Sequence, residues 1–256
     1  MGSEPQDWAV SQQPNWMLSQ LPPQTSERKW RLFAVACCRS IWSMLVDARV
    51  RDVVDKAELY ADNLISLQVL DQAREQAHSA ALEVARYIFA ITDHQEEPID
   101  GDEPFWASWA YYDLSWAFQA ASSSAAQDRK SLERTSWMVR NACSARSAQY
   151  ATDPNSSRAT AWQDTGARQC ELIREIFGNP FRPATIHPVW LTSSVREVAR
   201  RIDLTCRFFE LPILADALEE AGCDNPEILD HCRIRPPSGR KHVRGCWVVD
   251  LVLGKD

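Results

Sequence analysis

The chain has 256 residues, of which 45% are apolar and 25% are charged, so it is long enough for one large globular domain or two small ones. Its formal net charge of −7 argues against nucleic-acid or anionic-membrane binding, because both need a basic surface. It has no apolar run of about 18 residues and no signal-peptide pattern at its polar N-terminus, so we expect a cytoplasmic protein without a membrane span.

Apolar residues recur at three- and four-residue spacing along most of the chain, which predicts an all-α, multi-helix bundle. Residues 1–24 are rich in Pro, Gln and Ser, and we expect a mostly extended lead-in there. Helices are predicted over 27–45, 47–63, 67–91, 105–126, 128–150 and 158–177, with a loop over 153–157. The chain is also Trp-rich, with eleven Trp residues, which indicates an aromatic core. Part of that core is expected in the fourth helix, as a buried stripe of Phe105, Trp109, Tyr112 and Trp116.

The pattern breaks after Gly178, which is placed to end the helix before it. Beyond the break, helices are predicted from a capping box at Ser194 and Glu197, over 211–221, and from Pro226. The apolar stretch 246–253 fits a strand or a short buried helix equally well. The sequence therefore predicts a helical body over 25–177 and a C-terminal helical segment over 178–256.

The C-terminal segment is expected to pack back on the helical body, because it ends in a nearly continuous apolar run. Asp250 interrupts this run, so its carboxylate should face solvent or meet a base such as Arg244.

Cysteine and histidine residues gather near the C-terminus, where they could bind a metal. Cys223, Cys232, His242 and Cys246 could supply the four ligands of a structural zinc ion. Only His242 and Cys246 are closely spaced, and His231 competes with its neighbour Cys232 because adjacent helical residues point about 100° apart. Ordinary buried thiols with a hydrogen-bonded histidine are the favoured alternative, and in that case no cofactor is expected.

A basic stretch lies in the same region, around a turn at 236–239. Its members are Arg233, Arg235, Arg240, Lys241 and Arg244. They form either a solvated loop or a clamp for an anion, and they could also face the acidic stretch 93–103.

The chain lacks the usual sequence signs of catalysis. It has no nucleophile elbow, phosphate loop, dinucleotide-binding turn or HExxH motif. The eight Cys residues are expected to be reduced, and the adjacent pair Cys37 and Cys38 to be structural. We therefore expect a non-enzymatic interaction or regulatory module with a protein partner. The alternatives are an enzyme, or a metal-stabilised scaffold, with a Cys/His site in the C-terminal segment.

Four stretches are distinctive enough to compare with known families: RLFAVACCR at 31–39, IFGNPFRP at 176–183, LPILADALEEAGC at 211–223 and HVRGCWVVDL at 242–251. In these stretches the chain resembles a family of uncharacterised bacterial proteins that is abundant in planctomycetes. The resemblance covers both ends of the chain and leaves 92–160 weakly matched. It implies a conserved fold and no assigned activity.

Overall fold

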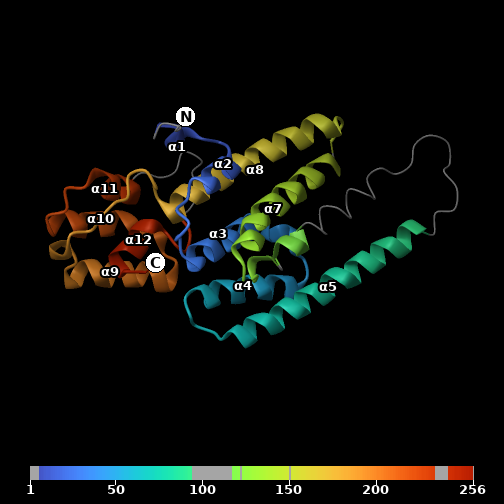
Figure 1. Cartoon of the computed structure of the whole chain (residues 1–256), viewed down its shortest axis with the longest axis horizontal. Helices are drawn as coiled ribbons and strands as arrows, with labels where there is room; N and C mark the ends of the chain where they lie inside the picture. Colours follow the sequence, from blue (N-terminus) through green and yellow to red (C-terminus); the bar gives the residue numbers. More distant parts are fainter. Residues whose placement is uncertain (1–5, 94–116, 122, 150, 234–241, 256) are drawn as a thin grey trace. The chain divides into compact units, whose positions relative to one another are not determined.

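The computed structural model describes residues 6–93, 117–121, 123–149, 151–233 and 242–255. Every regular element in these residues is a helix, so the prediction of an all-α multi-helix fold is confirmed (Figure 1). The chain divides into two compact units. The terminal unit joins Met1–Lys29 to Cys170–Asp256, and the central unit is Trp30–Gln169. This division does not coincide with the sequence-based boundary at 178, because residues 1–29 and 170–177 group with the C-terminal helices.

The helices of the central unit follow the predicted order. The unit begins within α3 (Glu27–Ser40). The elements that follow are the 3₁₀ turn η1 (Trp42–Met44), α4 (Ala48–Ala61), α5 (Leu67–Asp93), helical residues at 117–121 and 123–124, α7 (Arg129–Gln149) and the first part of α8 (Pro154–Phe177). α4 and α5 pack side by side as a helical hairpin (Figure 1). The helix predicted to reach residue 45 ends at Ser40, where the backbone tightens into η1. The predicted aromatic stripe 105–116 lies outside the described residues.

The start of α8 corrects the loop predicted over 153–157. Pro154 occupies the first helical position, where its missing N–H costs nothing. The Asp153 carboxylate accepts a hydrogen bond from the Ser156 backbone N–H at 3.3 Å, as a helix cap does. The same residue types that mark turns therefore begin a helix here.

The terminal unit begins with two short helices, α1 (Gln6–Val10) and α2 (Pro14–Ser19), where an extended lead-in was predicted. Burial of aromatic rings accounts for this order, because Trp8 is only 2% exposed and its ring meets Phe181 edge-on at 6.1 Å. The Arg174 guanidinium also donates to the backbone oxygens of Trp8 and Ser11. These contacts hold the N-terminal residues against the end of α8.

Beyond α8, the terminal unit consists of η2 (Pro188–Trp190), α9 (Ser193–Thr205), η3 (Phe208–Glu210), α10 (Leu211–Glu220), α11 (Pro226–Arg233) and α12 (Trp247–Leu253). One apolar core joins α9 to α12 and includes Val195, Ile202, Leu214, Leu218, Ile228, Val248 and Val252. The cap of α9 is Thr192, whose hydroxyl accepts from the Val195 N–H at 3.3 Å, and not the predicted box at Ser194. Thr192 and Ser194 both carry a hydroxyl close to the start of α9, so the sequence alone did not show which of them is the cap.

The open choice over 246–253 is settled by α12, which is a buried helix. Val248, Val249 and Val252 join the apolar core of the C-terminal helices. Packing of the whole C-terminal segment on the body 25–177 stays a prediction. Asp250 meets a base, but that base is Arg28 and not Arg244. The Arg28 guanidinium donates to both carboxylate oxygens of Asp250, at 2.8 and 3.2 Å.

None of the described helices combines the length and the hydropathy needed to cross a membrane.

Candidate metal centre

Four potential metal ligands converge in the terminal unit. Glu175 lies in the last turn of α8, His231 in α11, His242 just before α12, and Cys246 at the cap of α12. One donor atom from each lies within 4.8 Å of the other three. Within the described part of the chain, no other group of His, Cys, Asp or Glu meets this criterion.

A glycine brings the end of α8 close to α12. Gly178 has a φ of +68°, the left-handed conformation that ends many helices, and its N–H donates to the Arg174 oxygen at 3.1 Å. A Cβ atom at Gly178 would lie 3.4 Å from the Trp247 ring, so a larger residue would crowd this contact. This close approach places Glu175 beside the residues that begin α12.

The distances among the four ligands are those of direct polar contact. His242 Nδ1 lies 2.9 Å from Glu175 Oε2 and 3.0 Å from Oε1. His231 Nε2 lies 3.5 Å from Glu175 Oε2 and 3.2 Å from Cys246 Sγ. The two imidazole rings meet edge to face, with centroids 5.1 Å apart.

A fifth residue contacts the cluster from α12. The Trp247 indole N–H donates to His231 Nδ1 at 3.0 Å, and the two rings are T-shaped with centroids 5.0 Å apart. Trp247 cannot be a ligand, because its indole nitrogen has no available lone pair.

Burial controls the protonation of this cluster. The side chains of Glu175, His231 and His242 are 9%, 16% and 11% exposed, and Cys246 is fully buried. Burial lowers the pKa of His231, and the Glu175 carboxylate opposes this effect. Burial also raises the pKa of the Cys246 thiol well above its usual value, and the Glu175 charge raises it further. Without a metal, Cys246 is therefore a protonated thiol and His231 is a neutral imidazole at neutral pH.

The four ligands overlap only partly with the predicted set. His242 and Cys246 come together as predicted, whereas Cys223 and Cys232 lie outside the group, in the adjacent apolar core. Burial raises the pKa of both of these thiols, that of Cys232 to about 12.

His231 and Glu175 complete the cluster in their place. His231 and Cys232 point in different directions from α11, so the histidine faces the cluster and the cysteine faces the core. Glu175 was missed because one acid in a long helix carries no sequence signal. Its only mark is its position between Ile173 and Ile176, both of which are buried.

The structure tests the predicted anion-binding residues only in part. Arg233 pairs with Asp216 Oδ1 at 2.9 Å and Glu219 Oε2 at 2.6 Å, so acids of the same chain occupy its guanidinium. Arg244 donates to Cys206 Sγ at 3.4 Å. Arg235, Arg240 and Lys241 lie outside the described residues, as does almost all of the acidic stretch 93–103. An anion site there stays a prediction.

The adjacent cysteines Cys37 and Cys38 are poorly suited to nucleophilic or redox chemistry. All eight cysteines are free thiols, as predicted. Cys37 and Cys38 are fully buried, and burial raises the pKa of both, that of Cys38 to about 12. Such thiols carry little of the thiolate that is needed for nucleophilic or redox chemistry.

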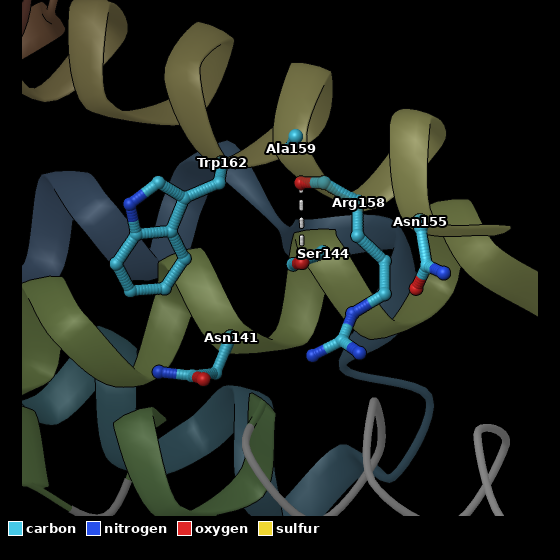
Figure 2. A pocket seen from close by; sticks show the side chains of 6 residues that line it. All are labelled: Asn141, Ser144, Asn155, Arg158, Ala159 and Trp162. Atoms are coloured by element: carbon cyan, nitrogen blue, oxygen red, sulfur yellow. Dashed lines mark hydrogen bonds between the residues drawn. The ribbon is translucent and has the colours of Figure 1, made fainter.

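The central unit has a shallow pocket of about 250 Å³ between α7 and α8 (Figure 2). It is lined by Asn141, Ser144, Asn155, Arg158, Ala159 and Trp162. The Ser144 hydroxyl donates to the Arg158 backbone oxygen, and the Asn141 amide donates to the Trp137 oxygen. The lining offers no thiol, imidazole or carboxylate, so the metal cluster is the stronger candidate for chemistry.

Comparisons of the chain with models of protein families, with curated proteins and with solved structures gave no match.

Proposed function

We propose that the chain is a non-enzymatic helical scaffold whose terminal unit is stabilised by zinc bound to Glu175, His231, His242 and Cys246. The supporting observation is the convergence of their four donor atoms within 4.8 Å. Imidazole nitrogen, thiolate sulfur and carboxylate oxygen are the donors that zinc takes, in sets of four. Magnesium and calcium prefer oxygen ligands alone, so this mixed set favours zinc over both.

The distances suit a tetrahedral ion. Zinc bonds of about 2.0–2.3 Å place neighbouring donor atoms roughly 3.3–3.7 Å apart in a tetrahedral site. The shortest distances are 2.9 Å between His242 and Glu175, 3.2 Å between His231 and Cys246, and 3.5 Å between His231 and Glu175. Zinc binding would widen the contact between His242 and Glu175 and draw in the donor atoms that lie up to 4.8 Å apart. Cys246 would bind zinc as a thiolate, so its thiol proton would be released. The positive charge of the ion would then stabilise the buried thiolate.

The burial of the cluster favours a structural ion over a catalytic one. Catalytic zinc usually has three protein ligands and keeps a fourth position for water or substrate. Here four protein donors are available, and none of their side chains is more than 16% exposed. The ion would connect the end of α8 to α11 and α12, which follow much later in the chain.

The same geometry argues against Cys246 as a nucleophile activated by His231. The indole N–H of Trp247 donates to His231 Nδ1, so the proton of the neutral ring is on Nε2, the nitrogen that faces the thiol. That nitrogen cannot accept the thiol proton. The raised pKa of Cys246 points in the same direction.

Metal analysis of the full chain tests the proposal. We expect about one zinc per chain after purification without a metal-binding tag, and its loss in His242→Ala and Cys246→Ser. Cys206→Ser is the matched control, because Cys206 is exposed and lies outside the cluster. Cobalt in place of zinc should give a thiolate-to-cobalt charge-transfer band that Cys246→Ser lacks. A folded full chain that takes up no zinc from a zinc-containing buffer would contradict the proposal.

A second proposal is that the scaffold binds a protein partner through exposed apolar residues of the terminal unit. Phe209 is 71% exposed and Ile213 is 50% exposed, one helical turn apart, and Leu204 at the end of α9 is 75% exposed. Contiguous exposed apolar patches often mark interaction surfaces, and the closeness of Phe209 and Ile213 along the chain supports such a patch.

Photo-crosslinking in cells tests the second proposal. A photoreactive residue at position 209 should give a discrete protein adduct. The same residue at position 10 is the control, because Val10 is 76% exposed in the same unit but lies on α1. Equal or absent labelling at the two positions would contradict an interaction surface at Phe209.

A further inference from the structure

We infer that Trp247 sets the affinity of the zinc site, because its indole and the metal ion compete for His231. The inference rests on the proposed function, since it concerns the same four ligands. The observation behind it is the 3.0 Å hydrogen bond from Trp247 Nε1 to His231 Nδ1, on the side of the imidazole opposite Cys246.

The competition follows from the lone pairs of imidazole. A neutral imidazole has one nitrogen that carries a proton and one that has a free lone pair. In the hydrogen-bonded state, Nδ1 uses that lone pair to accept from the indole. To bind a metal, Nε2 must offer the lone pair instead, and Nδ1 must carry the proton. Two N–H groups would then face each other across a distance that suits only a donor and an acceptor.

The conflict does not depend on which nitrogen faces the cluster. If the His231 ring turns over, the nitrogen next to the indole still has to accept, and the other still has no lone pair for the ion. His231 is therefore bonded either to the Trp247 indole or to the metal, and not to both.

The structure offers Trp247 a way to release the histidine. Trp247 is the first residue of α12 and is half-buried. When its ring turns, a water molecule can accept the indole hydrogen bond in place of His231. Its ring packs against Gly178 at the end of α8. Metal binding should therefore alter this contact, while the fully buried residues Val248 and Val252 stay in place.

The substitution Trp247→Phe tests the inference, because it removes the indole N–H and keeps an aromatic ring beside His231 and Gly178. We expect the Kd for zinc, measured by competition with a chromogenic chelator, to fall about two- to ten-fold, the equivalent of one net hydrogen bond. Trp190→Phe is the matched control. Trp190 packs on the core of the same unit but contacts His187 and not His231, so its substitution should leave the Kd unchanged.

A spectroscopic measurement on the wild-type chain covers the case in which Trp247→Phe does not fold. With nitrogen-15 in the eleven indole groups, zinc should move one indole N–H resonance away from its hydrogen-bonded position. Stoichiometric zinc binding that leaves every indole resonance unmoved would overturn the inference. An unchanged or weaker affinity in Trp247→Phe would do the same, and both results leave the zinc site standing. Absence of zinc binding in the wild-type chain overturns the proposed function and this inference together.

Discussion

Asp47 illustrates how a single side chain stabilises the central unit. Its carboxylate accepts from the Arg49 backbone N–H at 2.8 Å and thereby caps α4. The same carboxylate pairs with the Arg49 guanidinium, which also reaches Glu83 in α5 at 2.7 Å. The Arg49 side-chain hydrogen bond is the largest cause of a lowered pKa at Asp47. One acid therefore supports the start of α4 and, through Arg49, its contact with α5.

We predict a pH-dependent contribution from this cap. Because the pKa of Asp47 is lower in the folded state than its usual value of 3.8, its charge stabilises the fold above that value. This stabilisation disappears as the pH falls through the lowered pKa. Asp47→Asn keeps a capping oxygen but has no charge, so it should be less stable than wild type at pH 7, and this difference should shrink as the pH falls through the lowered pKa. Urea unfolding over a series of pH values checks this, and a difference that does not shrink in acid would contradict it.

The link between Arg28 and Asp250 shows how elements far apart in the sequence depend on each other. Arg28 lies in the first turn of α3 and Asp250 lies in α12, with side chains 12% and 2% exposed. Burial raises the pKa of Asp250, and the pairing with Arg28 lowers it in part. The arginine therefore offsets part of the cost of burying a carboxylate in an apolar helix.

We predict that Arg28→Met destabilises the terminal unit by about 3–5 kcal/mol, because it leaves a buried carboxylate without its partner. The double variant Arg28→Met with Asp250→Leu should regain most of this loss, since an apolar pair of similar volume needs no counter-charge. Urea unfolding of the two variants and wild type gives the comparison. A double variant as unstable as the single one would show that shape, and not charge, governs the contact.

Adjacent residues of α10 provide a sharper test of the packing between helices. Leu214 is fully buried in the core shared with α9, α11 and α12, whereas Ile213 beside it is 50% exposed. Leu214→Ala should lower the free energy of unfolding by about 2–5 kcal/mol, because it leaves a cavity. Ile213→Ala should change it by less than about 1 kcal/mol. Chemical denaturation measures both losses. Similar losses at the two positions would contradict the assignment of Leu214 to the buried face of α10 and Ile213 to its exposed face.

At the scale of the whole molecule, α12 completes the terminal unit. It contributes Val248, Val249 and Val252 to the core, Cys246 to the metal cluster and Asp250 to the ion pair. Its contacts with α9 and α11 connect it to both sides of this core.

We predict that deleting residues 246–256 abolishes the folding of the terminal unit. Hydrogen exchange should then become fast in α9, α10 and α11, which lose their shared core. Deleting only 254–256 is the control. It removes the ion pair between the partly exposed Lys255 and the buried Asp203, so it should weaken the terminal unit but leave its core folded. A chain without 246–256 that keeps slow exchange in α9 would contradict the prediction.

The sequence predicts the helices well because their signals are local. Gly178 and Gly222 end helices with positive φ angles, as their positions indicate, and Pro226 begins α11. Contacts between distant residues leave no such pattern. An arginine is expected on the surface, yet Arg31 is 1% exposed and donates to the backbone oxygens of Ser124 and Ala126. For the same reason, the sequence predicted only two of the four candidate ligands, His242 and Cys246, which are near each other in the chain. Glu175 is near them only in the fold.

The composition of the terminal unit has a consequence for the timing of synthesis. Residues 1–29 leave the ribosome before the central unit, but their partners in the terminal unit begin at Cys170 and extend to α12. At roughly 5–20 residues per second, the early segment waits several seconds or more, with Trp8 not yet covered. The central unit is continuous and can fold during that interval. The four candidate ligands are complete only when Cys246 has emerged, so the proposed zinc site can form only after the whole central unit has been synthesised.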